Sequence, residues 1–240
     1  MPAPTRATVA DMAAVLTQKQ AYFSPELFHF LIELRFNNRR DWFQANKPRY
    51  EALVRQPFLR FIADFAPHLE KISPDYLAGP QSLFRIQRDT RFSANKAPYK
   101  THAAAQFRHR RGRDVHMPGF YIHLEPDNCF LGAGIWMPEP ENLRRIRAAI
   151  ARQDPRWLGL RGRFELDGEG KLTRPPRGYR ADHPLIEDLK QRSFTVSYPL
   201  AEEVVTSDAL LPAVEKVFLE LLPLNQFLSE VLLLPQEEEP

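Results

Sequence analysis

The chain has 240 residues, a mass of 27.9 kDa and a net charge of +3, and its 43% hydrophobic content is enough for one compact domain that folds without disulfides or metals. Its single cysteine, Cys129, excludes a disulfide framework and a cysteine-based zinc cluster and favours a reducing, cytoplasmic environment. No apolar run reaches the ~18 residues of a membrane span, so we expect no membrane partner.

The expected organisation is a single domain with a short extension at each end. Residues 1–23 lack the basic start and apolar block of a secretory signal, and we expect them to form a flexible N-terminal arm. Residues 24–234 should form the domain. The acidic tail, residues 235–240, begins and ends with proline, which suits a disordered terminus.

Residues 24–71 are expected to form a helical layer. Ser24 can cap a first helix, whose apolar residues recur at helical spacing. Asp41 can cap a second helix, which Pro48 should kink or restart because proline lacks the backbone donor. Pro57 should open a third helix.

From residue 83 the apolar period changes from helical spacing to alternation, which predicts β-strands. We expect a central four-stranded antiparallel meander over residues 83–88, 103–108, 120–124 and 129–136, and one more strand over 194–198. Helices are expected from Pro140, over 184–190, and as a C-terminal pair separated by Pro223. This order favours an α+β fold with a mostly antiparallel sheet packed with N-terminal and C-terminal helices.

Basic residues are concentrated in the middle of the chain. Nine of them and a single acid, Asp89, lie between Arg85 and Arg113, so this segment has a charge of +8 and the rest of the chain, within the total of +3, has −5. Such a concentration is typical of a site for phosphate, carboxylate or nucleic acid, although a solvated surface has the same composition.

Seven residues of this segment form our candidate anion site: Arg85, Arg88, Asp89, Arg91, Lys96, Tyr99 and Lys100. Guanidinium groups bind carboxylate and phosphate oxygens in pairs, lysines add movable charges, and Asp89 can hold a neighbouring guanidinium in place. The alternative is structural, with Arg88 and Asp89 forming a buried ion pair at a turn and Tyr99 only packing.

Arg177 and Tyr179 are candidates for the same anion site. They flank a glycine in a proline-rich loop that could bring a guanidinium and backbone amides to the ligand. The alternative in this region is that Asp182 caps the helix that Pro184 opens.

Gly132 and Gly134 leave one face of a predicted strand without side chains, so a ligand or another backbone can approach it. We expect these glycines, with Trp136, to line one concave site with Arg85 and residues 88–91.

The histidines do not have the spacing of metal ligands. No two lie at i and i+4 on a helix beside a carboxylate motif, so we predict no metal site and no cofactor. His102, beside the basic cluster, is the one histidine that we retain as a candidate general acid or base. Cys129 lies in an alternating strand and is expected to be a core residue.

Several short stretches form a distinctive pattern. They include Asn37-Asn38-Arg39, Asp41-Trp42-Phe43, Arg88-Asp89-Thr90-Arg91-Phe92-Ser93, Pro98-Tyr99-Lys100-Thr101-His102, Gly132-Ala133-Gly134-Ile135-Trp136 and Pro176-Arg177-Gly178-Tyr179. On these residues the chain resembles the family known as domain of unknown function 2461, over residues 24–230. The resemblance implies no activity, because the family has no assigned reaction to transfer.

Three functions follow from these observations. The first is a pocket that binds a phosphorylated or carboxylated small molecule, with or without catalysis. The second is a nucleic-acid-binding domain, in which an arginine-rich hairpin lies near rings that stack on bases; its residues are Arg108, Arg110, Arg111, Arg113, Phe107 and Tyr121. The third is a protein-interaction module whose arginines form structural ion pairs. We favour the first, because converging pockets mix residue types whereas nucleic-acid grooves repeat one basic type.

Overall fold

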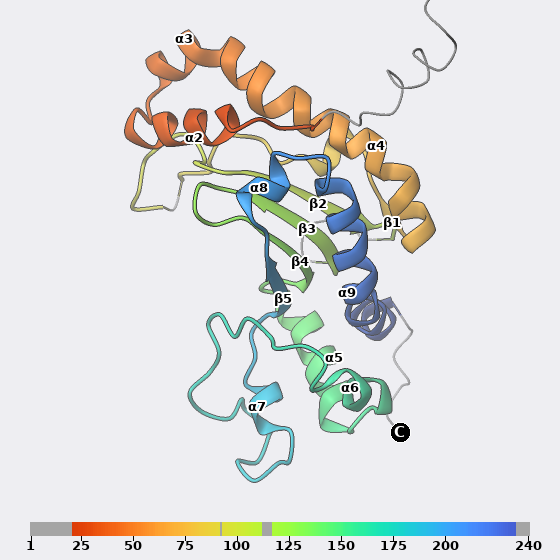
Figure 1. Ribbon diagram of the computed structural model, residues 1–240. Coiled ribbons are helices and arrows are strands. Elements are labelled where there is room, and N and C mark those ends of the chain that lie inside the picture. Colours follow the sequence, from red (N-terminus) through yellow and green to blue (C-terminus); the bar gives the residue numbers. More distant parts are fainter. Residues whose placement is uncertain (1–20, 92, 112–116, 234–240) are drawn as a thin grey trace, which may run out of the picture.

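The computed structural model describes residues 21–91, 93–111 and 117–233 and has an α+β fold (Figure 1). An antiparallel sheet lies at the centre, with helices above it, below it and on one side. The expected N-terminal arm lies almost entirely, and the acidic tail entirely, outside the described residues. No helix in the described ranges is long and apolar enough to cross a membrane.

The N-terminal helical layer consists of α2 (Glu26–Phe36) and a long helical run formed by α3 (Arg40–Tyr50), the π-helical segment η1 (Glu51–Arg55) and α4 (Gln56–Ile72). As predicted, Pro57 lies in the first turn of α4, and the π-helical segment η1 separates α4 from α3, which contains Pro48. The backbone nevertheless stays helical from residue 40 to residue 72, so the two helices are continuous. The apolar face of α4, with Phe58, Phe61 and Phe65 fully buried, continues through this run and holds it against the core.

The sheet has five strands rather than the four of the expected meander, in the order β1-β2-β3-β4-β5. These strands are β1 (Tyr76–Leu77), β2 (Ala103–His109), β3 (Gly119–Leu124), β4 (Phe130–Ile135) and β5 (Phe194–Pro199).

The strand expected over residues 83–88 is replaced by two isolated pairings. Leu83 pairs with Ala105 of β2, whereas Gln87 pairs with Tyr99, four residues before β2 begins. The short helix η2 (Pro80–Ser82) separates this segment from β1. Residues 83–91 and 93–100 therefore leave the sheet edge and fold back on themselves, and we call them the folded-back segment. Their basic side chains lie beside the sheet rather than in it.

One face of the sheet packs on α9 (Leu210–Leu233), where Phe218 stacks on Phe120 of β3 with ring centroids 4.6 Å apart. We expected two helices separated by Pro223, but the structure has one helix with Pro223 inside it. Buried residues on both sides of the proline, including Leu221 and Leu224, hold the helix together.

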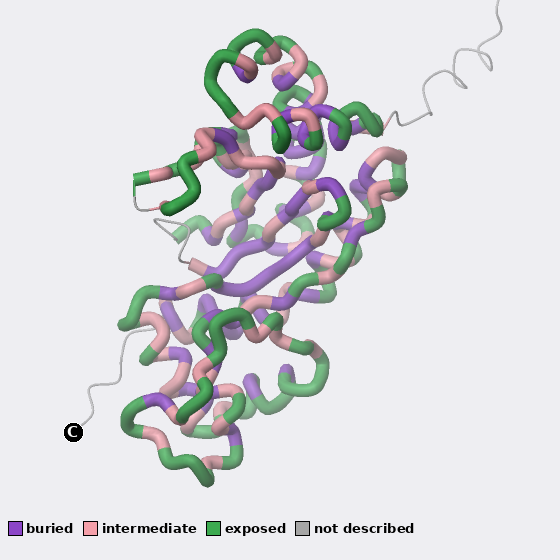
Figure 2. Tube along the Cα trace, turned by 90° about the vertical axis from the view of Figure 1, so that its left-hand side faces the viewer, coloured by how far each residue is buried: buried purple, intermediate pink, exposed green. Residues whose placement is uncertain are grey.

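Shorter elements complete the fold. They are α5 (Pro140–Ala151), α6 (Pro155–Leu160), α7 (Ile186–Leu189) and α8 (Glu202–Val205). The first three lie below the sheet in Figure 1 with the loops that connect them. Figure 2 looks toward the face of the sheet opposite α9, where the strands are visible between loops above and below.

Candidate functional site

Polar side chains gather on the face of the sheet opposite α9. Phe107, Phe120 and Ala133 are register partners on the α9 face, so the alternate residues of β3, Tyr121 and His123, lie on the other face. The β2–β3 pairing sets Ala103 opposite Leu124 and Ala104 opposite His123. Extending this register by one pair places His102 opposite Glu125, so three ionisable side chains meet at one end of two neighbouring strands.

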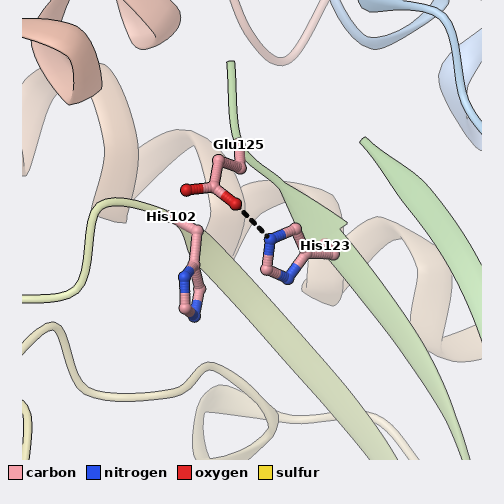
Figure 3. A group of neighbouring side chains, drawn as sticks. All are labelled: His102, His123 and Glu125. Carbon is pink, nitrogen blue, oxygen red and sulfur yellow. Dashed lines mark hydrogen bonds and ion pairs between the residues drawn. The ribbon is translucent and has the colours of Figure 1, made fainter. Parts of the chain in front are cut away.

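Tyr121, His123 and Glu125 form a hydrogen-bonded chain along this edge of β3. The Tyr121 hydroxyl lies 2.9 Å from Nδ1 of His123. Nε2 of His123 lies 3.3 Å from Oε2 of Glu125 (Figure 3). The ring of Phe130, the register partner of His123 on β4, stacks on the imidazole with a centroid distance of 4.7 Å. The imidazole is therefore fixed in position and orientation.

Glu125 is held by several donors besides His123. Thr101 donates its hydroxyl to Oε1 at 3.2 Å, Arg35 at the end of α2 donates to the same oxygen at 3.4 Å, and Asn128 donates to Oε2 at 3.3 Å. Burial alone would raise the pKa of Glu125, but the hydrogen bonds from His123, Asn128 and Thr101 lower it. The carboxylate is thus ionised at neutral pH.

His102 lies beside this chain, with its ring centroid 4.4 Å from that of His123 (Figure 3). Burial lowers the pKa of His102 to about 4, with further lowering by His123, Lys100 and Arg88 against the opposing effect of Glu125. Burial also lowers the pKa of His123. Both imidazoles are therefore neutral at pH 7. Neither ring nitrogen of His102 has a hydrogen-bond partner among the described residues.

Asn38, which lies between α2 and α3, binds the segment that precedes β2. The Asn38 side chain donates to the carbonyl of Tyr99 at 2.9 Å and accepts from the amide of Tyr99 at 3.0 Å. The Tyr99 ring stacks on Phe43 at a centroid distance of 4.0 Å. These contacts fix the backbone on both sides of Tyr99, from which Lys100 and His102 project.

A cavity of about 450 Å³ lies between the end of α2, the folded-back segment and the start of β2; we call it the His102 cavity. Its lining residues are Arg35, Asn38, Arg88, Asn95, Ala97, Tyr99, Lys100, Thr101 and His102. Three of these side chains are cationic, and Glu125 is the acid that contacts one of them, Arg35.

Arg88 and Lys100 have no carboxylate at ion-pair distance within the described ranges. The Arg88 guanidinium makes two long bonds of 3.4 Å to neutral acceptors, the carbonyl of Ala97 and the hydroxyl of Ser93. The Lys100 ammonium lies 4.9 Å from the centre of the Phe84 ring, and burial, followed by the charge of Arg85, lowers its pKa. An anion in the cavity would give the Arg88 guanidinium a charged partner and would raise the pKa of Lys100 toward its usual value.

The structure divides the predicted anion cluster. Arg88, Tyr99 and Lys100 line the His102 cavity, whereas Arg85 lines a neighbouring cavity of about 370 Å³ with residues of α3 and η1. Tyr99 is 5% exposed and its side chain packs in the core, as we expected if its role is only structural.

The remaining residues of the cluster are exposed. Asp89 forms its ion pair with Arg91, at 2.6 Å, and not with Arg88, so the buried Arg88–Asp89 pair is not formed. Lys96 donates to the carbonyl of Thr90 at 3.0 Å.

Arg177 and Tyr179 lie far from this cluster. The loop that contains them is in the part of the molecule below the sheet, whereas the folded-back segment is at the opposite end (Figure 1). Arg177 is exposed and Tyr179 packs against the core. The alternative prediction, that Asp182 caps the following helix, was wrong. Asp182 instead forms an ion pair with Arg180 at 2.8 Å.

The glycines of β4 serve the approach of another backbone rather than of a ligand. A Cβ on Gly134, where φ is +119°, would lie 1.9 Å from the carbonyl oxygen of Phe194 in β5, and one on Gly132 would lie 3.2 Å from that of Val196. Trp136 is 55% exposed and donates its ring N–H to Glu169.

One of the two aromatic rings that the nucleic-acid interpretation requires near the arginine-rich hairpin is not accessible. Phe107 is fully buried on the α9 face and cannot stack on a base. Arg108 and Arg110 donate to backbone carbonyls of Gln81 and Pro74, and Arg113 lies outside the described residues.

Sequence reasoning assigned no site role to Arg35, Asn38, His123 and Glu125, and it gave Tyr121 only the role of a ring that stacks on bases. The prediction of no metal site considered helical spacing alone. His102, His123 and Glu125 instead meet through the alternation of residues along β3 and just after it, and through the register of β3 with β2. The register between β2 and β3 could not be predicted from the sequence, because the connection from His109 to Gly119 is longer than a tight turn.

A family model described as a conserved hypothetical protein (DUF2461) matches residues 26–227. The chain therefore belongs to this family, as the resemblance suggested. No curated protein matches the sequence.

Proposed function

We propose that this member of the DUF2461 family binds a small molecule bearing a phosphate or carboxylate group in the His102 cavity. The observation that carries the proposal is the pair of cations, Arg88 and Lys100, that line one cavity without a carboxylate partner among the described residues. A half-buried cation without a counter-ion is costly, and an anionic ligand offsets that cost.

The shape and chemistry of the cavity support a small ligand rather than a polymer. Its volume of about 450 Å³ falls within the usual range for ligand pockets, roughly 300–1,000 Å³. Arg88 offers a planar fork for two oxygens and Lys100 a point charge, a combination suited to a group with several oxygens. His102 at the same cavity is neutral and can exchange a proton with a bound ligand, so the pocket can serve catalysis as well as binding.

Titration calorimetry and thermal melting with inorganic phosphate and with a sugar phosphate test this proposal. At about 100 times the dissociation constant, binding stabilises the fold by about 2.7 kcal/mol, which raises the melting temperature by about 5–10 °C for a chain of this size. Arg88→Gln and Lys100→Gln should each weaken binding at least tenfold. Arg111→Gln, which removes the same charge from an exposed residue outside the cavity, should leave it unchanged.

Equal affinity in all three variants would refute the cavity as the site. A steep fall in affinity for a single-stranded oligonucleotide with salt, with a slope of about 0.7–0.9 per phosphate and flattened by Arg111→Gln, would instead support nucleic-acid binding. If neither class of ligand binds, the interaction module is the remaining interpretation. We retain the prediction of a cytoplasmic location, supported by the free, buried thiol of Cys129.

A further inference from the structure

His102, His123 and Glu125 bring their ligand atoms within 4.8 Å of one another (Figure 3). From this geometry we propose that the three side chains bind one divalent transition-metal ion, such as Zn²⁺, Mn²⁺ or Co²⁺, beside the His102 cavity, which His102 itself lines. Two imidazoles and one carboxylate are a common ligand set for such ions, and they leave coordination positions open toward a substrate. The inference does not depend on the proposed anion. With the ion bound, His102 is a metal ligand and its coordinating nitrogen does not exchange a proton with the anion.

The distances are close to those that a bound ion requires. Two ligands bound tetrahedrally at about 2.0–2.1 Å are about 3.4 Å apart, and the Nε2 of His123 is already 3.3 Å from Oε2 of Glu125. Ligands of one ion cannot be more than about 4.2 Å apart at such bond lengths, so a pair near the 4.8 Å limit must approach by several tenths of an ångström. A side-chain rotation of His102, which has no hydrogen-bond partner among the described residues, supplies this movement.

The surrounding groups resemble the supports that orient metal ligands. With Nε2 of His123 on the ion, its Nδ1 donates to the Tyr121 oxygen 2.9 Å away, and this bond fixes the tautomer. The second oxygen of Glu125 is held by Thr101 and Arg35. His102 is half-buried and lines the cavity, so the open coordination positions would face the space where the anion is proposed.

Nearby positive charges weaken the binding of a metal ion at this site. Arg35, Arg88 and Lys100 all line the same cavity and repel a dication. An anion that binds both the ion and these cations removes the repulsion, so metal and anion should strengthen each other's binding by the same factor. The proposal therefore predicts weak binding of the metal alone and tighter binding in the presence of inorganic phosphate.

Full-length protein stripped with a chelator and titrated with Co²⁺, followed by visible absorption, tests the site. We expect one ion per chain, with binding weakened at least tenfold by His102→Gln and by Glu125→Gln. The matched control is His68→Gln, which removes a histidine 2.9 Å from another glutamate, Glu215, outside the cluster. Melting curves of the metal-free variants establish that they are folded, and His102→Gln is the decisive one because it breaks no hydrogen bond within the described residues.

Binding that is unchanged in folded His102→Gln, or weakened equally by His68→Gln, would overturn the proposal. So would the absence of binding by Co²⁺, Zn²⁺ and Mn²⁺ at millimolar concentration, both with and without phosphate. Phosphate binding that persists in the presence of chelator would still support the anion site, so the two proposals fail separately.

Discussion

The Asn38 side chain is expected to control both stability and the His102 cavity, because it forms two hydrogen bonds to the backbone of Tyr99. Asn38→Ala removes bonds of 2.9 and 3.0 Å, each contributing about 1 kcal/mol. It also leaves the amide and carbonyl of a residue that is 5% exposed without these partners, which adds to the cost. We expect a loss of about 2–4 kcal/mol, or about 4–16 °C in melting temperature.

Urea denaturation measures this loss as a lower midpoint at constant slope. The matched control is Asn37→Ala, because Asn37 makes a single side-chain bond, 2.9 Å long, to the carbonyl of Glu33 and should cost about 1 kcal/mol. Asn38→Ala should also weaken phosphate binding, since Lys100 follows Tyr99 directly. Equal losses in the two variants would refute the reasoning and assign the anchoring of Tyr99 to its stacking on Phe43.

Two further predictions concern the sheet and the alkaline limit of stability. Gly134→Ala must displace Phe194 and strain a backbone with φ of +119°, so it should cost about 3 kcal/mol or more in urea denaturation, whereas Gly159→Ala, with no atom within 4 Å of the new Cβ, should be neutral or slightly stabilising. Burial raises the pKa of Tyr76 to about 12, above the usual value of about 10 for an unfolded chain. The stability it contributes is therefore complete below pH 10 and lost as the pH rises to 12, on the order of 2 kcal/mol, and Tyr76→Phe should flatten the pH dependence of the urea midpoint in that window. A midpoint for Gly134→Ala equal to that of the unsubstituted protein, or an unchanged alkaline slope in Tyr76→Phe, would contradict these expectations.

Local patterns predicted most of the fold. Alternation located β2, β3, β4 and β5, and helical spacing located α2, α4 and α5, because each of these elements buries one regular apolar face. The edge strand β1 has two residues, too few to alternate. Pro57 marked the start of α4 correctly, whereas Pro223 lies inside α9, because burial on both sides of it outweighs the loss of one backbone hydrogen bond.

The candidate site was only half accessible from the sequence. Arg88 and Lys100 were found by the concentration of positive charge, which is a local property of the chain. Asn38 contacts a residue 61 positions away, and Arg35 contacts Glu125 across 90 positions. Such contacts depend on how α2 and the residues directly after it pack beside the sheet. This packing cannot be predicted from the periodicity of the helix or of the strands.

The most direct test of the central claim is the position of a bound anion. Crystals grown without sulfate or phosphate and soaked in sodium tungstate, whose anomalous scattering identifies it, would locate the anion. We predict the strongest anomalous peak inside the His102 cavity, within hydrogen-bond distance of the Arg88 guanidinium and the Lys100 ammonium, and its loss in Arg88→Gln. Peaks at exposed arginines such as Arg111, with the cavity unoccupied, would contradict the account.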